Sequence, residues 1–318
     1  MNKRQWLKFL AALPLAGMSP SWAQDKPIQI IVPFGPGGSG DISARMLAEF
    51  ITKKTGRAVV VDNRAGGNGI IGVEAVRGAT ADGSVLLLAT TSTHLANPSL
   101  FRKLPYDPAR DFRLVGSFGP GSAYMLTRPD APYKTLQDFI RAAKAAPDSI
   151  NYGHFNATSK VTAALFAHEA GISLTGIPYK QVGQAMTELM AGQIQVVFTD
   201  SVQGESFVAS GQLKALAVHS ATRLARRPDI PRISEVVPSF TMRGVFLGIA
   251  VPTATPLATQ QALNALINEA VTTDPIKSRL ESFAFAPASI SLTELATFER
   301  EERAKWKQYV ELAKIEVQ

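Results

Sequence analysis

The sequence predicts an α/β protein with two domains, and three observations support this. Strand-like and helix-like segments alternate along the chain, which is typical of a largely parallel sheet covered by helices. An apolar run at residues 28–32 passes through a glycine-rich turn into a helical pattern, and the same order recurs from residue 150. With 318 residues, the chain also exceeds the size at which single hydrophobic cores stop growing.

Composition excludes several classes of protein. The chain has no cysteine, so it has neither disulfides nor thiolate metal sites, and its four histidines are dispersed without metal-ligand spacing. We therefore expect no metal and no cofactor. The formal net charge is +7, and it falls to +4 when the basic residues of the first segment, Lys3, Arg4 and Lys8, are removed. Because the remaining basic residues are scattered, we expect no binding to nucleic acid.

The first segment is typical of an export signal. Lys3 and Arg4 precede an apolar stretch, and small residues at Ser21 and Ala23 form a cleavage-like end. We expect a signal peptide within residues 1–24, cleaved after Ala23, and export to the periplasm by the general secretory or the twin-arginine route. No later apolar run approaches the roughly 20 residues of a membrane span, so we expect a soluble product.

The first motif, I-Q-I-I-V-P-F-G-P-G-G-S-G-D, occupies residues 28–41. Its apolar start predicts a strand buried on both faces, which Pro33 ends. The glycines that follow permit positive φ or close approach of a ligand, and apolar residues from Ile42 to Phe50 repeat at helical spacing. Because amides at a helix start lack partners and the helix dipole is positive there, this turn is a predicted anion site.

The next elements extend the predicted sheet. Strands are expected at residues 58–62 and 85–90, with a helix at about residues 70–77 between them. A polar turn follows each strand, N-R-A-G-G-N-G in the first case and T-S-T-H-L-A-N-P in the second. Because the carboxyl ends of parallel strands gather on one side, the turns after Val32, Asp62 and Thr90 should share one crevice.

The chain then crosses into a second domain. Residues 104–120 are rich in proline and glycine, so we place the crossing near their end. A second glycine-led turn, G-H-F-N-A-T-S-K at residues 153–160, feeds a helix that continues through residue 168. The other strands expected here are residues 123–127, 150–152, 177–179, 194–198 and 213–218, and the other helices are residues 136–145 and 185–190.

A strand at residues 245–251 should return the chain to the first domain, where two apolar helical stripes near the C-terminus support it. The predicted boundaries are residues 25–122 plus 236–318 for domain 1 and residues 123–235 for domain 2. Such a path creates hinge strands and a cleft between the domains, and clefts of this kind close on small ligands.

A dinucleotide-binding enzyme is the rival interpretation. Residues 35–40 match G-x-G-x-x-G, and Asp62 ends the second strand about 20 residues on, where a ribose-binding acid belongs. This favours an NAD(P)-dependent oxidoreductase. The export signal argues against it, because secreted compartments hold little soluble dinucleotide, and Pro33 and Pro36 stiffen the turn. No G-x-S-x-G motif occurs, so we expect a binding protein without catalysis.

Several blocks together resemble the Bug family of periplasmic solute-binding receptors, the receptor component of tripartite tricarboxylate transporters found in Bordetella. They include V-P-F-G-P-G-G-S-G-D, V-D-N-R-A-G-G-N-G, N-P-S-L-F-R-K-L-P-Y-D-P-A-R-D-F, I-N-Y-G and R-R-P-D-I-P. The resemblance implies two Rossmann-like α/β domains of periplasmic-binding-protein type (type II-like), joined by hinge strands. It also implies a cleft that captures a small organic carboxylate.

The resemblance places ligand contacts in the strand-end turns of both domains. The first turn supplies Phe34, Gly37, Gly38, Ser39 and Asp41, the third-strand turn Ser92, Thr93 and His94, and the domain-2 turn Gly153, His154, Asn156, Ala157, Thr158, Ser159 and Lys160. Tyr179 and Asp200 complete the set. Amides of Gly38 and Ser39 can donate to a carboxylate, and Phe34 can shield these bonds from water.

Three of these positions leave alternatives open. Asp41 is either an ordinary helix N-cap or a ligand contact. Lys160 stands where the family usually has histidine, and a cation in the first helical turn is unfavourable by roughly 0.3–1 kcal/mol, so it points away or an anion offsets it. Asp200 follows Thr199, where many members have aspartate, and a one-residue shift turns a strand side chain to the other face. That shift argues against a ligand role for Asp200.

We therefore expect an exported, monomeric binding protein for a small organic acid, which is a di- or tricarboxylate, an amino acid or an aromatic acid. Its partner would be inner-membrane permease subunits. A membrane-bound sensor protein is an alternative partner that the sequence does not distinguish from a permease.

Overall fold

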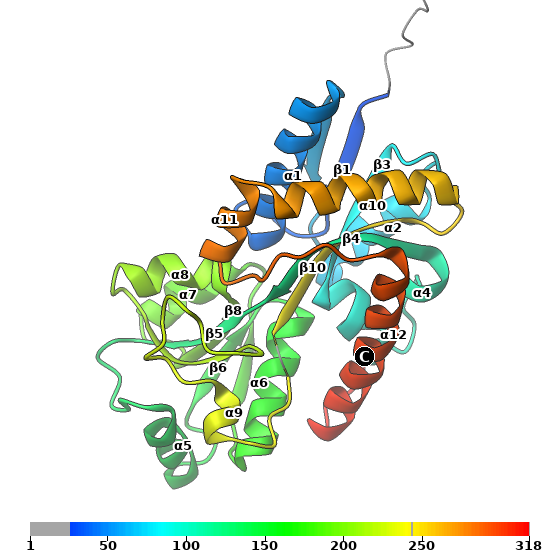
Figure 1. Ribbon diagram of the computed structural model, residues 1–318. Coiled ribbons are helices and arrows are strands. Elements are labelled where there is room, and N and C mark those ends of the chain that lie inside the picture. Colours follow the sequence, from blue (N-terminus) through cyan, green and yellow to red (C-terminus); the bar gives the residue numbers. More distant parts are fainter. Residues whose placement is uncertain (1–25, 243, 318) are drawn as a thin grey trace, which may run out of the picture.

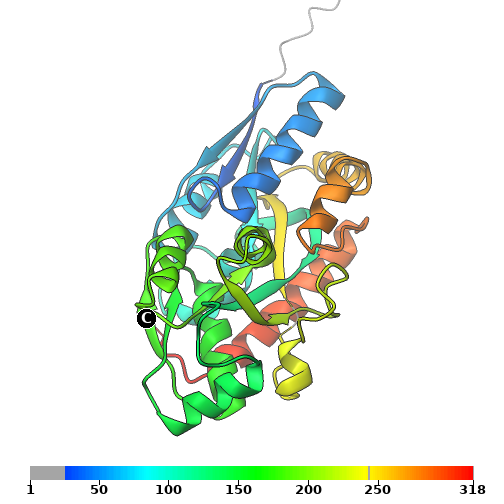
Figure 2. The same cartoon turned by 90° about the vertical axis from the view of Figure 1, so that its left-hand side faces the viewer.

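A computed structural model describes residues 26–242 and 244–317. The predicted signal peptide and its cleavage after Ala23 lie outside the described residues. Two five-stranded sheets form two lobes, one above the other in the perpendicular views of Figures 1 and 2. We call the lobe built on the first sheet lobe 1 and the other lobe 2.

The sheet of lobe 1 has the strand order β2-β1-β3-β10-β4. These strands are β2 (Val59–Asn63), β1 (Ile28–Val32), β3 (Val85–Thr90), β10 (Val245–Pro252) and β4 (Phe112–Gly121). β1 pairs in parallel with β2 and β3, whereas β10 is antiparallel to both its neighbours. The apolar side chains of β1 alternate between two core clusters: Ile30 packs with Leu47, and Ile31 packs with Val73. The prediction that β1 is buried on both faces is confirmed.

The sheet of lobe 2 repeats this arrangement with the order β7-β6-β8-β5-β9. Its strands are β7 (Thr175–Pro178), β6 (Asn151–His154), β8 (Val196–Asp200), β5 (Ala123–Thr127) and β9 (Lys214–His219). In each sheet the fourth strand is antiparallel and arrives from the other lobe. The predicted α/β class is confirmed, with one antiparallel strand in each otherwise parallel sheet.

Helices pack against both sheets, and their bounds are as follows. Lobe 1 carries α1 (Ser39–Thr55), the 3-10 turn η1 (Gly67–Gly69), α2 (Ile70–Arg77), the π-helical turn η2 (Thr91–Ala96), α3 (Asn97–Leu100), α4 (Pro108–Asp111), α10 (Leu257–Thr272), α11 (Ile276–Ser282) and α12 (Leu292–Leu312). Lobe 2 carries α5 (Leu136–Ala145), α6 (Ala157–Ala170), α7 (Val182–Met190), α8 (Ser201–Ala209) and α9 (Ile233–Val236).

β4 corrects one expectation. Its residues lie largely within the segment read as a proline- and glycine-rich crossing, yet they form a strand of 10 residues. The glycines mark close packing instead of a turn. A Cβ at Gly116 would lie 2.4 Å from the Ile267 side chain of α10, and a Cβ at Gly119, where φ is +93°, would lie 2.3 Å from the Ala286 carbonyl oxygen.

The chain crosses between the lobes at two adjacent places. Only Ser122 separates the end of β4 from the start of β5. The return path enters β10 at Val245, which pairs with Gly121 in the ladder. Gly244 has φ +126°, and a Cβ there would lie 2.0 Å from the Gly121 carbonyl oxygen. The two crossings therefore touch each other.

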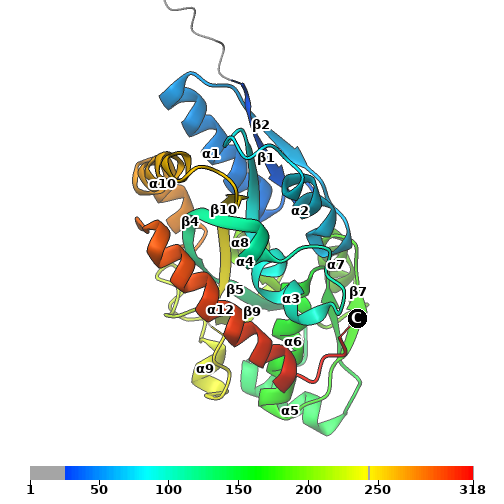
Figure 3. The ribbon, with the colours of Figure 1, turned by 90° about the vertical axis from the view of Figure 1, so that its right-hand side faces the viewer.

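The last helix contacts both lobes. Figure 3 shows α12 running from the β4 side of lobe 1 down towards α6 of lobe 2. It packs against β4, η2 and α3, and also against α6. Trp306 of α12 and Phe166 of α6 belong to one apolar cluster. The sequence predicted that the C-terminal helices support the first domain, whereas α12 packs against lobe 2 as well. The predicted domain boundaries stay predictions. Within residues 26–242 and 244–317, no helix combines the length and apolar character that a bilayer crossing requires.

Candidate functional site

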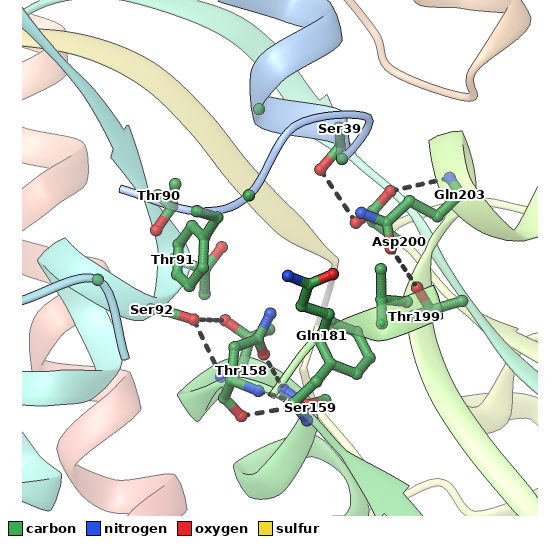
Figure 4. A pocket seen from close by; sticks show the side chains of 18 of the residues that line it. Ser39, Thr90, Thr91, Ser92, Thr158, Ser159, Gln181, Thr199, Asp200 and Gln203 are labelled. Atoms are coloured by element: carbon green, nitrogen blue, oxygen red, sulfur yellow. Dashed lines mark hydrogen bonds between the residues drawn. The ribbon is translucent and has the colours of Figure 1, made fainter. Parts of the chain in front are cut away.

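A cavity of about 650 Å³ lies between the two lobes. Lobe 1 lines it with residues 34–41, 65–69, 90–92 and 245–247. Lobe 2 contributes Ala123, Phe155, Asn156, Thr158, Ser159, Thr162, residues 179–183 and 198–200, Gln203 and His219. The turns after β1, β2 and β3 thus meet in one crevice, as the sequence predicts. Figure 4 shows polar side chains from both lobes pointing towards one another there.

The start of α1 is open to this cavity. Gly37 takes φ +79°, and the N-cap residue is Gly38, which has no side chain with which to cap the helix. The first intrahelical hydrogen bond runs from the Ile42 amide to the Gly38 carbonyl at 3.0 Å. The amides of Ser39, Gly40 and Asp41 therefore precede the helical ladder and have no intrahelical acceptor. This helix end presents donors and a positive dipole to a ligand.

Asp41 holds this turn in place. Its carboxylate accepts the Gly37 amide at 2.9 Å and the Arg45 Nε at 3.0 Å, and Arg45 also forms an ion pair with it. Burial opposes ionisation, but the hydrogen bonds from Arg45 and the Gly37 amide keep the pKa of Asp41 below its ordinary value. Asp41 is therefore not the N-cap of α1, which is Gly38: its carboxylate accepts a backbone amide that precedes the helix, and the residue also lines the cavity, so its ligand role stays a prediction.

The turn after β3 is a short π-helix with its own cap. Thr90 Oγ1 accepts the Thr93 amide at 3.2 Å, and Thr93 Oγ1 accepts the Thr90 amide at 3.1 Å. Thr93 and His94 are fully buried behind this turn and do not line the cavity. Burial, with a contribution from Arg303, lowers the pKa of His94 to about 3. Of the three residues predicted here, only Ser92 reaches the cavity.

Ser92 joins lobe 1 to the start of α6. Its hydroxyl shares a hydrogen bond of 2.8 Å with the Thr158 hydroxyl and accepts the Thr158 amide at 3.2 Å. Asn156 caps the same helix by accepting the Ser159 amide at 2.8 Å. The second glycine-led turn therefore faces the cavity as predicted, but its Thr158 and Ser159 amides already have acceptors. The two helix ends are not equivalent, and α1 offers the freer donors.

Asp200 reaches the cavity despite the one-residue shift. It ends β8 and is the N-cap of α8, where it accepts the Gln203 amide at 3.2 Å. Its other carboxylate oxygen accepts the Ser39 hydroxyl across the cleft at 3.0 Å. Burial raises the pKa of Asp200, although these hydrogen bonds favour the ionised form. The strand rule that argued against this residue does not apply, because Asp200 lies where the strand becomes a helix.

The remaining predicted residues fall on or near the cavity wall. Phe34 and Tyr179 line the main cavity, whereas Gly153 does not. His154, Ala157 and Lys160 line a second cavity of about 260 Å³ beside it.

Sequence reasoning missed several polar side chains of lobe 2. Gln181 is the N-cap residue of α7, and Figure 4 shows its amide reaching into the middle of the cavity. Gln203 accepts the Thr199 hydroxyl at 3.3 Å, and its Nε2 lies 3.0 Å from the position a Cβ at Gly38 would occupy. His219 is buried at the cavity wall, and its Nδ1 has no hydrogen-bond partner among the residues that the structure describes. Gln181 could have been predicted from its place after a parallel strand, because the turns that follow parallel strands gather on one side of the sheet.

The electrostatics of the main cavity favour an anion held by neutral donors. Among the described residues, four α-helices begin at its wall: α1, α6, α7 and α8. Among the described residues that line it, only Asp41, Lys180 and Asp200 carry formal charge at neutral pH, and Lys180 is exposed. Attraction of an anion to this cavity would therefore depend on helix dipoles and on amide or hydroxyl donors, and not on buried cations.

The two features that suggested a dinucleotide site, the glycine turn and Asp62, do not line the same cavity. Asp62 does not line the cavity, and its carboxylate accepts Gln29 Nε2 at 3.0 Å and Arg64 Nε at 2.9 Å. The acid expected to bind a ribose is therefore engaged elsewhere. In the described part of the chain, no group of three or more His, Asp or Glu side chains is arranged to hold a metal ion.

A family model and a curated relative agree on the family that this chain resembles. A family model described as the tripartite tricarboxylate transporter family receptor matches residues 43–315. Protein BugT of Bordetella pertussis is 34% identical over 263 residues, which are 81% of this chain and 79% of BugT.

Solved structures agree in fold. Periplasmic binding protein BugD is 25% identical with a TM-score of 0.85, over 92% of this chain and 99% of BugD. MatC from Rhodopseudomonas palustris with bound malate is 26% identical with a TM-score of 0.83, over 89% of this chain and 98% of MatC. The two lobes are thus α/β domains of periplasmic-binding-protein type, which confirms the predicted fold class.

Proposed function

The chain belongs to the tripartite tricarboxylate transporter receptor family, and on that premise we propose that it captures a small organic carboxylate in its interlobe cavity. Membership also confirms the resemblance to Bug receptors drawn from the sequence. The family is one of transport receptors, which fits the expectation of a binding protein without catalysis.

The observation that carries the proposal is the open start of α1. Its first amides have no intrahelical acceptor and no capping side chain, and they face a cavity of about 650 Å³. A carboxylate there would accept charge-assisted hydrogen bonds and interact favourably with the dipole of a helix of 17 residues. The cavity volume suits a small metabolite, since ligand pockets typically measure about 300–1,000 Å³. The malate bound to MatC supports this ligand class.

We further propose that the protein is exported to the periplasm as a monomer and delivers its ligand to inner-membrane permease subunits. Export is supported by the signal-like first segment and by the description of BugD as a periplasmic binding protein. A sensor protein would use the same capture step with a different membrane partner.

A thermal-shift assay with a panel of small carboxylates, applied to the protein from residue 24 onward, tests the proposal. A ligand at 100 times its Kd adds about 2.7 kcal/mol to the free energy of unfolding. We expect at least one carboxylate to stabilise the protein and NADH to have no effect. Stabilisation by NADH with none by any carboxylate would overturn the proposal in favour of the oxidoreductase.

A further inference from the structure

His219 is a buried polar side chain at the wall of the main cavity, where it ends β9. Only 2% of its surface is exposed, and its Nδ1 is enclosed without a hydrogen-bond partner. Its Nε2 has no partner either among the residues that the structure describes. Most buried polar groups in folded proteins are paired, because an unpaired one is unfavourable. The described chain supplies no partner for this imidazole, although the cavity beside it can hold one.

The register of the lobe 2 sheet places the His219 side chain on the cavity side. Ala123 pairs with His219 in one ladder and with Asp200 in the other. Because paired residues of antiparallel strands have side chains on the same face, these three residues share one face, and all three line the cavity. Two strand spacings separate the Cα atoms of His219 and Asp200 by roughly 10 Å.

This row of strand ends reaches the start of α1. Asp200 accepts the Ser39 hydroxyl across the cleft at 3.0 Å, and Ser39 is the first residue of α1. His219 lies at the other end of the row. The α1 amides and the His219 imidazole can therefore contact opposite ends of one small ligand.

The imidazole suits an uncharged polar group. Burial lowers the pKa of His219 to about 4, so the ring is neutral at pH 7. Phe240 packs against it in a T-shaped contact, with ring centroids 6.2 Å apart. With Nδ1 enclosed, Nε2 is the nitrogen left for a ligand, and it donates or accepts according to the tautomer. A hydroxyl group can serve either tautomer, whereas a second carboxylate would find no cation here and would lie near Asp200.

We propose that His219 is a specificity-determining residue, which binds a hydroxyl group of the ligand whose carboxylate occupies the start of α1. The ligand is then a hydroxy acid with a single carboxylate. The inference rests on the proposed function and adds to it the chemical group at the far end of the ligand. A side chain that only packed within lobe 2 would affect all ligands alike, whereas His219 should affect those with the hydroxyl group.

The test compares straight-chain ω-hydroxy acids, from hydroxybutanoate to hydroxyoctanoate, with two sets of analogues. In one set a methyl group replaces the hydroxyl, and in the other a carboxylate replaces the carbon that carries it. Affinities are measured by isothermal titration calorimetry on the wild type, His219→Leu, His219→Phe and His168→Gln. Leucine and phenylalanine both remove the ring nitrogens, and His168 is an exposed histidine on α6 that provides the control. Thermal unfolding of each ligand-free protein at pH 7 verifies folding.

We expect the wild type and His168→Gln to bind one hydroxy acid about threefold to tenfold more tightly than its methyl analogue, and also more tightly than its dicarboxylate. Both His219 variants should bind the hydroxy acid and the methyl analogue equally. They should unfold at the wild-type temperature or above it, because they replace a buried polar group that has no partner.

A folded His219 variant that keeps the hydroxyl preference would overturn the inference and leave the proposed function intact. A wild type that binds the methyl analogues or the dicarboxylates at least as tightly as the hydroxy acids would do the same. A clear loss of stability in both variants would also overturn it, since the ring would then already serve the fold. A wild type that binds no carboxylate at all would instead overturn the proposed function and the inference with it.

Discussion

Two carboxylates border a cavity that we assign to an anion. Their ion-pair and hydrogen-bond partners reduce the repulsion between these carboxylates and the bound anion. Asp41 is paired with Arg45 and accepts the Gly37 amide. Asp200 accepts the Ser39 hydroxyl and the Gln203 amide, and burial raises its pKa. Both carboxylates of the site are thus hydrogen-bonded to protein donors, and the first amides of α1 remain available to the ligand.

Gly38→Asp should abolish carboxylate binding without unfolding the protein. Gly38 has φ −79° and ψ 168°, which any residue adopts, and aspartate is a preferred N-cap. The new carboxylate would accept the amides that we assign to the ligand, after a small shift of the Gln203 side chain. Thermal unfolding should show a ligand-free stability equal to or above that of the wild type, with no shift on adding ligand.

Gly38→Asn is the matched control for charge. It can cap the same amides but adds no negative charge, so we expect weaker binding than in the wild type and stronger binding than in Gly38→Asp. Equal ligand-induced shifts in all three proteins would contradict the assignment of the seat to α1.

Two buried histidines should make stability fall in acid. Burial lowers the pKa of His94 to about 3 and of His219 to about 4, below the unfolded value near 6.5. The unfolded state therefore takes up protons first as the pH falls below 6.5. From pH 7 to pH 5, each histidine should reduce the free energy of unfolding by roughly 2 kcal/mol.

Urea denaturation at several pH values measures this effect. His94→Gln should have a shallower fall in stability between pH 7 and pH 5 than the wild type. His168→Gln, which removes an exposed histidine on α6, should keep the wild-type slope. A slope that is the same in both variants would show that His94 does not resist protonation in the folded state.

At the scale of elements, helix starts converge on one cavity but differ in what they offer. α6 is capped by Asn156 and contacted by Ser92, and α8 is capped by Asp200. α1 and α7 have N-cap residues without a side-chain cap. We therefore expect the ligand to bind mainly to α1, with Gln181 at the start of α7 available to contact its other atoms.

Gly244→Ala should disturb the crossing between the lobes. Its φ of +126° is strained for alanine, and the new Cβ would lie 2.0 Å from the backbone oxygen of Gly121. Gly56→Ala is the matched control, because φ is +75° there but nothing lies within 4 Å. Urea denaturation should show a loss of about 1 kcal/mol for Gly56→Ala, from backbone strain alone, and a clearly larger loss for Gly244→Ala. Equal losses would mean that the crossing relaxes easily.

Elements with clear periodicity were predictable, and those shaped by close packing were not. The strand–turn–helix order around β1 and α1 follows from apolar spacing and glycine position. β4 was missed because glycines needed for contact with Ile267 and Ala286 resemble turn signals. α8 was missed as well: Gly204 interrupts its pattern because a Cβ there would lie 2.7 Å from Tyr124. Within the site, long-range contacts such as Ser39 with Asp200 have no local sequence signal.

At the scale of the whole molecule, the lobes contact each other directly across the cleft. Ser39 with Asp200 and Ser92 with Thr158 form hydrogen bonds of 3.0 and 2.8 Å between lobes. Both pairs lie at the wall of the cavity, so the same surfaces that would bind the ligand also hold the lobes together. Ligand binding and closure should therefore be coupled.

Ser92→Ala should shift the ligand-free protein towards a more open form. It removes the hydrogen bonds to the Thr158 hydroxyl and amide, each worth about 0.5–1.5 kcal/mol, and it leaves the α1 amides intact. Because the chain has no cysteine, spin labels at Ile71→Cys and Lys144→Cys can report the distance between lobes. We expect a longer distance in Ser92→Ala than in the wild type, restored by saturating ligand. An unchanged distribution would show that this contact does not hold the lobes together.

A crystal structure of the protein with its tightest-binding carboxylate is the most direct test of the central claim. We predict carboxylate oxygens within about 3.2 Å of amide nitrogens at the start of α1, between the two lobes. A carboxylate bound outside the interlobe cavity, or one that lies in it without contacting those amides, would contradict the account.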